Sequence, residues 1–394
     1  MEYGYDLLEW LGPDASTSVF SYLNDPADLV RATAVSRSWR QFIITNGLSK
    51  TLCMKLCPEV SYFTGIKEVA TSTKKAKQDC SSSDKEWREH ERDHKIYIYL
   101  SSHLVTPRGT NNCISYCIGA SSTDNYPEEI IENTLDSTLS YWSSSGQVDP
   151  TVLESLTYQL NFDLGFVDKI SIQPFKAFFQ LDDPIYSSKY VRFKMGYSKS
   201  PNMSTNFKLD QGRLTADENY VWTYISPEFP MLQVIMKQLF IILSVCNVHQ
   251  HLVRGIFQED IQQAFRLPLP ALCIGGVVKI EFLGRIQKQD MDDLFYICIR
   301  NVQVKGRALS PVLGVDLSEI KGGCVLKYCP SAWRAAVLDG YVVSGTKVRR
   351  NLLQFSALTA WFWWWFVPLY ILGIVYVFFP YFCRAPSVVL NILE

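Results

Sequence analysis

The spacing of apolar residues predicts helices at the start of the chain. From 6 to 58, apolar residues recur every three or four positions, as expected for short amphipathic helices. Asp25 is suited to an N-cap position, and Pro26 suits the first turn of the helix that follows, where its missing N–H costs nothing. The successive apolar stripes contain Val19, Phe20 and Leu23, then Leu29, Val30, Thr33 and Ala34, then Val35, Trp39 and Phe42. We therefore predict three short helices in this segment.

A polar stretch follows the predicted helices. Residues 70–85 contain almost no large apolar side chain and are rich in Ser, Thr, Lys and Asp. Such a stretch cannot bury enough surface to offset the loss of chain entropy, which predicts a linker. A charged helix is expected from Asp84 to about Leu100, with Trp87 and the apolar residues at 96–100 on its packing face. Residues 64–105 are thus assigned to a polar linker and a charged helix.

Between 110 and 307 the period of the apolar pattern changes to two. Leu156, Tyr158 and Leu160 alternate with polar residues, and the alternation recurs at 170–173, 191–195, 278–282 and 295–299. This period predicts strands with one buried face, as in an antiparallel sandwich or barrel. Val302 and Val304 continue the last run in shifted parity, which predicts a β-bulge. The predicted fold is α+β and multidomain, with a helical N-terminal part followed by an antiparallel β-sandwich.

An apolar segment at 234–258 interrupts the β pattern. Its uninterrupted apolar run, 239–243, is too short to span a bilayer, which takes about 20 residues. Three interpretations stay open: an amphipathic helix inserted in a loop, additional core, or the translation of a retained intron. The intron is our leading hypothesis, because valine codons begin with GT and a glutamine codon can be CAG. Val234 and Gln258 would then mark its ends.

The C-terminal part divides into an irregular tail, 308–353, and an apolar segment, 354–383. The apolar segment contains no charged residue and is crowded with Trp, Phe and Tyr. It is long enough for one membrane span of about 20 residues. Basic residues within 347–350 precede it and Arg384 follows, which would keep the N-terminal bulk in the cytosol and make the segment a tail anchor. Its prolines would kink such a helix, and translated non-coding sequence is the alternative.

Composition narrows the classes of function. Hydrophobic residues make up 47% and charged residues 20% of the chain, as in an ordinary globular protein. The formal net charge of −1 provides no overall field to attract nucleic acid, so no nucleic-acid partner is expected. The 11 cysteines show no recurring spacing, and the acidic N-terminus lacks the features of a signal peptide. We expect a reducing compartment, cytoplasm or nucleus, with a tail-anchored membrane location as the alternative.

The sharpest catalytic motif is His90-Glu91-Arg92-Asp93-His94. It spells H-E-x-x-H, in which two histidines bind zinc and the glutamate acts as a base. The neighbouring residues are charged, and no third ligand follows at a suitable spacing. We therefore interpret this segment as a charged surface helix with ion pairs four residues apart.

Other signs of catalysis or metal binding are weak. Cys53 and Cys57, like Cys113 and Cys117, have a spacing that zinc sites allow, but nothing else in the sequence supports a metal, so free buried thiols are preferred. No glycine-rich phosphate loop and no nucleophile paired with a histidine is found. Trp142 is expected in the core rather than on a sugar-binding surface. We predict no catalytic residue, no metal and no cofactor.

The helical segment, 6–58, resembles an F-box. The resemblance rests on three runs with the order and spacing of the family's anchors: Val19-Phe20-Ser21-Tyr22-Leu23, Asp25-Pro26-Ala27-Asp28-Leu29 and Val35-Ser36-Arg37-Ser38-Trp39-Arg40. The chain departs from the family at Leu11-Gly12-Pro13, where the proline stands one place late, and at Ala15-Ser16-Thr17, where leucines are common. A first helix that binds its adaptor less tightly would follow. A small helical bundle without a partner is the alternative.

The F-box resemblance implies a non-catalytic role. It would make the chain the substrate receptor of an SCF-type ubiquitin ligase, joined through a Skp-family adaptor to a cullin and binding an unknown protein target. The residues expected to contact the adaptor match the motif and are Pro13, Val19, Phe20, Leu23, Leu29, Val35 and Trp39. Some of them, Trp39 in particular, would instead hold the helices together.

Residues 110–307 resemble a galactose-binding-like, discoidin-type β-sandwich of the jelly-roll kind. The similar features are short runs at 120–122, 132–136, 141–144 and 160–165, and the closing sequence V-Q-V-K-G-R at 302–307. An F-box followed by this sandwich resembles one group of plant F-box proteins, in which loops at one end of the sandwich would bind the target. The alternative function is a lectin-like or general protein-binding module, membrane-anchored or not, without a role in ubiquitin ligation.

Overall fold

The computed structural model describes residues 6–69, 82–105, 109–136, 140–181, 183–199, 215–232, 262–317 and 323–335. The chain divides into two compact units, 1–330 and 331–394, and the helices and strands named below belong to the first. The apolar insertion at 234–258 and the candidate membrane segment at 354–383 lie outside the described residues. Within the described ranges, no helix is both long and apolar enough to cross a membrane.

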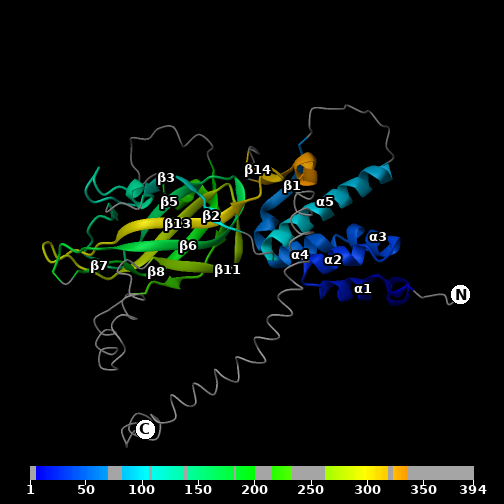
Figure 1. The fold of residues 1–394 in the computed structure, drawn as a ribbon, viewed down its shortest axis with the longest axis horizontal. Helices are drawn as coiled ribbons and strands as arrows, with labels where there is room; N and C mark the ends of the chain where they lie inside the picture. Colours follow the sequence, from blue (N-terminus) through cyan, green and yellow to red (C-terminus); the bar gives the residue numbers. More distant parts are fainter. Residues whose placement is uncertain are drawn as a thin grey trace, which may run out of the picture. The chain divides into compact units, whose positions relative to one another are not determined.

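The N-terminal segment folds into short helices, as predicted (Figure 1). Gly12 has a φ of 75° and divides the first helix at the Leu-Gly-Pro sequence, so that Pro13 opens its second piece. Asp25 caps the next helix by accepting a hydrogen bond from the backbone N of Ala27 at 2.8 Å, and Pro26 occupies the first turn. The bounds are α1 Leu7–Ser21, α2 Pro26–Thr33, α3 Arg37–Thr45, α4 Leu48–Leu56 and the 3₁₀ helix η1 Pro58–Tyr62. Helix α4 extends the predicted set of three.

Helix α5, Ser82–Val105, is the predicted charged helix, and it packs on α2, α3 and α4. Ile96 and Leu100 are fully buried, and Ile98 packs against the apolar core of α1–α4. On its charged side, Glu91 accepts a hydrogen bond from Nη2 of Arg40 in α3 at 2.7 Å. Helices α1–α5 thus form one helical domain.

Two antiparallel sheets follow and share one apolar core (Figure 1). The first has the order β10-β8-β12-β5-β3, with β9 beside β8. The second has the order β11-β6-β13-β2, with β4 on β13 and β7 on β6. The bounds are β2 Asn111–Asn112, β3 Ile114–Ala120, η2 Ile131–Thr134, β4 Trp142–Ser143, β5 Glu154–Leu160, β6 Leu164–Lys176, β7 Ile185–Tyr186, β8 Ser188–Ser198, η4 Asp217–Asn219, β9 Tyr220–Ile225, β10 Phe229–Pro230, β11 Gln263–Ile274, β12 Val277–Arg285 and β13 Cys298–Ala308. The expectation of antiparallel sheets is confirmed.

The alternating pattern located the strands but not the burial of their polar face. The predicted bulge in β13 is present as a register shift against β6 between Ile299 and Asn301. Thr157, Lys279 and Glu281, expected to face solvent, are buried. Lys279 and Glu281 are held there by polar contacts, since Nζ of Lys279 donates to Thr215 O at 2.9 Å and pairs with Asp217 at 2.6 Å, while Glu281 pairs with Lys194 at 2.7 Å. The first sheet is thus buried on both faces near its centre.

The passage from β11 in one sheet to β12 in the other uses Gly275 and Gly276. Their φ angles are 83° and 72°, in the left-handed region that side chains other than glycine rarely adopt. A Cβ on Gly276 would lie 2.1 Å from the carbonyl O of Phe162. This corner therefore requires glycine for both conformation and space.

Two segments that we predicted to be irregular form a small third sheet. Strand β1, Phe63–Glu68, pairs in parallel with β15, Cys324–Tyr328, which pairs antiparallel with β14, Leu313–Asp316. The predictions of a polar linker from 64 and an irregular tail from 308 were wrong for these strands. The reason is that ladder hydrogen bonds come from the backbone, so a short and mostly exposed strand such as β1 has little alternation to detect.

Candidate functional site

Phe20 and Leu29, two of the predicted adaptor contacts, lie in the interior of the helical domain. Their side chains are 6% and 1% exposed and belong to its apolar core. The Phe20 ring meets Trp39 edge-on with 5.3 Å between centroids, and aromatic pairs of this kind add about 0.5–1.5 kcal/mol to burial. Leu23 and Trp39 are half-buried against the same core. All four side chains hold the helices together, and a direct contact with an adaptor remains a prediction.

Trp39 also fixes the start of α1 against α3. Its Nε1 donates to Oδ1 of Asp6 at 2.8 Å, while Oγ of Ser38 donates to Oδ2 of Asp6 at 2.7 Å. Asp6 is at the same time the N-cap of α1 and accepts from the backbone N of Leu8. The hydrogen bond from Ser38, followed by those from Trp39 and Leu8, lowers the pKa of Asp6. The motif tryptophan therefore has a structural role, one of the two roles that the sequence left open.

The other predicted contacts, Pro13, Val19 and Val35, face solvent. The two valines are 48% and 62% exposed. Between 10 and 35, three further exposed apolar side chains were not among the predicted contacts: Trp10, Tyr22 and Val30. The spacing of Val19 and Tyr22, three positions apart at the end of α1, was the available signal. Exposed apolar side chains mark a protein-binding surface where they form a contiguous patch, whereas single ones are common on any protein.

The H-E-x-x-H motif lies on α5 and forms the ion pairs that we expected. Glu91 pairs with Arg40 at 2.7 Å and with Lys95 at 3.4 Å, and Nε2 of His90 lies 3.8 Å from Glu86. Burial, helped by the charge of Arg40, lowers the pKa of His94 to about 4. Among the residues that the structure describes, no group of three or more His, Cys, Asp or Glu side chains is placed to hold a metal ion.

The four cysteines weighed as zinc ligands are free and buried, as preferred in the sequence analysis. Sγ of Cys57 donates to Oε2 of Glu59 at 3.1 Å. Burial raises the pKa of all four thiols, that of Cys53 to about 11. A thiol with a raised pKa is a poor nucleophile at neutral pH. These four cysteines therefore act as buried packing residues.

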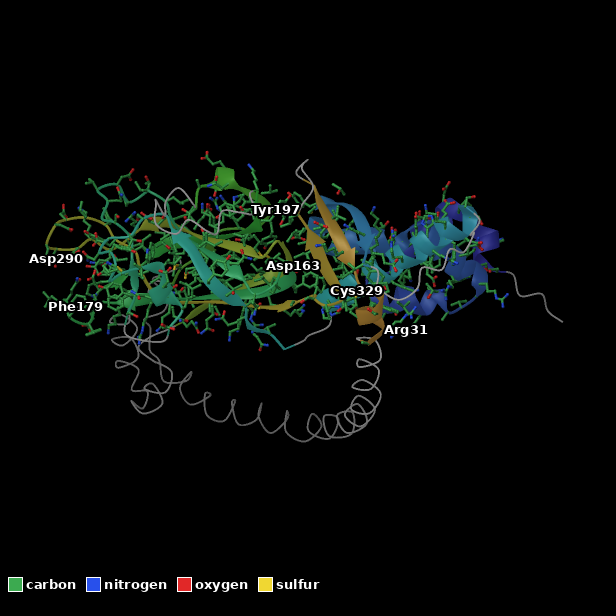
Figure 2. All side chains as sticks on the ribbon, turned by 90° about the horizontal axis from the view of Figure 1, so that it is seen from above. Arg31, Asp163, Phe179, Tyr197, Asp290 and Cys329 are labelled. Atoms are coloured by element: carbon green, nitrogen blue, oxygen red, sulfur yellow. The ribbon has the colours of Figure 1, made fainter. Side chains whose placement is uncertain are left out.

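A pocket of about 230 Å³ lies among the loops at one end of the sandwich, and we call it the end pocket. Its walls come from the segment between β3 and β4, from the turn after β6, from β7 and from the loop between β12 and β13. Figure 2 shows Phe179 and Asp290, on two of these loops, at the same end of the sandwich. The lining residues are Asp124, Asn125, Glu129, Tyr141, Ser143, Phe175, Ala177, Phe179, Gln180, Tyr186, Gln289, Tyr296 and Cys298.

The end pocket has an aromatic floor. Tyr141 stacks on Phe175 with 3.8 Å between centroids and 17° between ring planes. Phe175 belongs to a small cluster of buried side chains with Tyr186, Tyr296 and others, separate from the main core. The sequence analysis expected target binding on loops at one end but named no residue there, because loop residues follow no period that could mark them.

Comparison with known proteins identifies an F-box-like domain in the helical N-terminal part of the chain. Residues 13–55 match the F-box-like family. The chain is 41% identical to the F-box protein At4g00755 of Arabidopsis thaliana over 333 residues, which cover 82% of this chain and 81% of that protein.

Among solved structures, similarity is found to carbohydrate-binding modules and to a domain of a DNA-repair protein. The family 32 carbohydrate-binding module of C. perfringens NanJ, solved with galactose, shares 11% identity with a TM-score of 0.27, covering 48% of this chain and 90% of that one. The N-terminal domain of the single-strand break repair protein XRCC1 shares 11% identity with a TM-score of 0.28, covering 49% and 97%. Because the identity with the Arabidopsis protein extends over most of both chains, this chain belongs to the F-box protein family, in a group that includes that plant protein.

Proposed function

We propose that this F-box protein is the substrate-recognition subunit of an SCF-type ubiquitin ligase. In this proposal the helical domain binds a Skp-family adaptor, which links the chain to a cullin, and the sandwich binds the protein target. The chain supplies no catalytic group. It acts by holding the target close to a ubiquitin-carrying enzyme, which raises the effective concentration of the reacting groups.

The observation that carries this proposal is a set of exposed apolar side chains on a helical domain whose interior is filled by other apolar residues. Phe20 and Leu29 are buried in this interior. The exposed side chains are Val19, Val35 and Pro13. Burying such side chains against a partner releases about 25 cal/mol per Å² of apolar surface. A few buried apolar anchors at the centre of an interface commonly carry most of its binding energy.

Binding of the full chain to a purified Skp-family adaptor tests the proposal. Helix α5 packs on α2, α3 and α4. A fragment that ends near residue 60 would lose these contacts, so the full chain is used in the binding assay. We expect Val35→Asp and Val19→Asp each to weaken binding at least about tenfold, because each would place an unpaired charge in an apolar contact. Isothermal titration calorimetry measures the change.

Val148→Asp is the matched control, since Val148 is an exposed valine on a sandwich loop. It should bind the adaptor like the wild type. If the wild-type chain binds no adaptor, the ligase proposal fails and a general binding module takes its place. If it binds and both valine variants bind equally well, the adaptor surface is elsewhere.

We further propose a reducing location, the cytoplasm or nucleus. Eight cysteines in the described part of the chain are free, and buried thiols of this kind persist where disulfides are not formed. The tail anchor, which lies outside the described residues, remains a prediction that membrane extraction of the full chain would test.

A further inference from the structure

We propose that the end pocket accepts a lysine or arginine side chain of the protein target. The inference rests on the proposed receptor function and deepens it by naming the chemistry of the target. It is carried by three features of the pocket: its charge, its aromatic walls and its size.

The charge of the end pocket is negative and unbalanced. Its lining contains Asp124 and Glu129 but no Lys, Arg or His. Asp292 adds a third carboxylate beside the lining residue Tyr296, whose hydroxyl donates to it at 2.5 Å. None of the ion pairs found within the described ranges uses these three carboxylates.

Two lysines close in sequence to lining residues, Lys288 and Lys176, already form ion pairs with other carboxylates. Nζ of Lys288 lies 2.8 Å from Asp293, and Nζ of Lys176 lies 3.1 Å from Asp183. Burial and the charges of Glu129 and Asp292 raise the pKa of Asp124, as expected of carboxylates that repel one another. A bound cation would relieve this repulsion.

Aromatic rings form the other walls. Phe179, a lining residue, and its neighbour Phe178, which is not one, are each 62% exposed and lie 6.2 Å and 6.4 Å from the Phe175 ring centroid. The faces of aromatic rings attract cations within about 6 Å and also cover the methylene stem of a long basic side chain. Tyr141 unites both features, since its ring stacks on Phe175 and its hydroxyl donates to Glu129 at 2.8 Å.

The size of the pocket and its surroundings favour a polypeptide over a free amine. About 230 Å³ is smaller than the roughly 300–1,000 Å³ typical of drug-sized ligand pockets, and suits one side chain. On each of its loops an exposed apolar residue stands one or two positions along the chain from a lining residue: Tyr126, Leu181 and Met291. Such a rim would contact the chain on either side of an inserted residue.

Titrating the full-length protein with pentapeptides tests this inference. The peptides are acetylated and amidated, with lysine, arginine, norleucine or Nε-acetyl-lysine at the centre of Gly-Ala-X-Ala-Gly, and ligand-observed NMR follows binding. We expect the lysine or arginine peptide to bind at least about tenfold more tightly than the two neutral ones. Equal binding of charged and neutral peptides would overturn the proposal, whatever the variants show.

Variants then locate the site. Glu129→Gln and Asp124→Asn should each weaken binding of the preferred basic peptide by about fivefold, as expected for the loss of one partly exposed charge pair. Asp293→Asn is the matched control, because that carboxylate pairs with Lys288 and does not line the pocket. Thermal unfolding confirms that each variant is folded. Folded Glu129 and Asp124 variants that bind like the wild type would overturn the assignment.

Adaptor binding, measured on the same preparations, separates this inference from the proposed function. A protein that binds the adaptor but does not distinguish basic from neutral peptides contradicts only the pocket. A protein that selects basic peptides but binds no adaptor contradicts the ligase role and supports the pocket.

Discussion

The helical domain and the sandwich use a motif tryptophan in different ways. Trp39 is half-buried, with its Nε1 bonded to Asp6 at the edge of the helices. Trp142 is fully buried in the sandwich core, and its Nε1 donates to Ser122 O at 3.1 Å. A small helical domain has little interior, so each anchor lies near the surface and can serve packing, binding or both. A sandwich with two sheets separates these roles, because strands pack and loops bind.

The two regions also differ in what their interiors contain. Both have an apolar core cluster, and the segment after α4 buries Glu59, which accepts a hydrogen bond from Cys57. The sandwich buries the guanidinium of Arg285 in an ion pair with Glu154, where the two side chains are 0% and 3% exposed. Ser121 and Ser122 donate to the same carboxylate. Substitution of Arg285 should therefore act mainly through charge, and substitution of Leu29 in the apolar cluster of the helices mainly through volume.

The largest effect is expected at Arg285. Its Nη1 donates to Ser144 Oγ, Ser145 O and Phe295 O, each at 2.9 Å. Arg285→Met should lower the free energy of unfolding by about 4 kcal/mol, since it leaves the Glu154 charge buried without its partner. Chemical denaturation followed by near-UV circular dichroism measures the loss.

Two further variants sharpen the test at Arg285. Arg266→Met, an exposed arginine on β11, should change the free energy of unfolding by less than about 0.5 kcal/mol. The double variant Arg285→Met with Glu154→Gln should recover part of the stability. If the double variant is no more stable than the single one, burial of the unpaired charge is not the cause of the loss.

A smaller effect, through volume alone, is expected at Leu29. Leu29→Ala should cost about 3 kcal/mol, because it removes apolar contacts and leaves a cavity between helices. Val30→Ala, one position along α2 and exposed, should cost well under about 1 kcal/mol. Urea unfolding monitored by tryptophan fluorescence compares them. Similar losses for both variants would contradict the division of this helix into an inner and an outer face.

An effect of at most similar size is a pH dependence at the contact of α5 with the helices before it. The pKa of His94 falls from 6.5 to about 4 through burial, with Arg40 and Lys95 opposing protonation and Glu91 favouring it. Between these values the unfolded chain binds a proton that the folded chain does not, so stability decreases as the pH falls from about 6.5 to 4. The loss should reach at most about 3 kcal/mol.

Melting temperatures across this pH range test the assignment. His94→Gln should flatten the dependence, because glutamine does not titrate. His90→Gln, a substitution of the more exposed histidine on the same helix, should leave it unchanged. A slope that survives in His94→Gln would assign the pH dependence to other groups.

Most strands and helices could be predicted because each buries one face with a regular period. Leu156, Tyr158 and Leu160 showed β5, and the spacing of Val19, Phe20 and Leu23 showed α1. The same pattern could not tell that Phe20 is an inner residue and Val19 an outer one, since both are apolar and adjacent.

Other features leave no periodic trace. The pair of Arg285 and Glu154 joins residues whose sequence neighbourhoods give no sign of burial. The carboxylates of the end pocket stand on separate loops, and only the folding of the two sheets brings Asp124 near Asp292. Strand β1 contains Thr64, Lys67 and Glu68, which also suit a linker. These features depend on tertiary contacts between distant segments.

The parallel ladder of β1 and β15 has a mechanical consequence. Oγ1 of Thr64 donates to Cys324 O, and the backbone of β1, which lies between η1 and α5 in the sequence, runs beside that of β15, the last strand in the described part of the chain. A sandwich joined to the helices by one covalent connection alone could rotate freely together with a bound target. A second attachment, through the hydrogen bonds of this ladder, restricts that rotation. In the receptor function proposed above, this second attachment narrows the set of target positions within reach of the enzyme, so deletion of residues 324–328 should broaden the set of target sites that are modified.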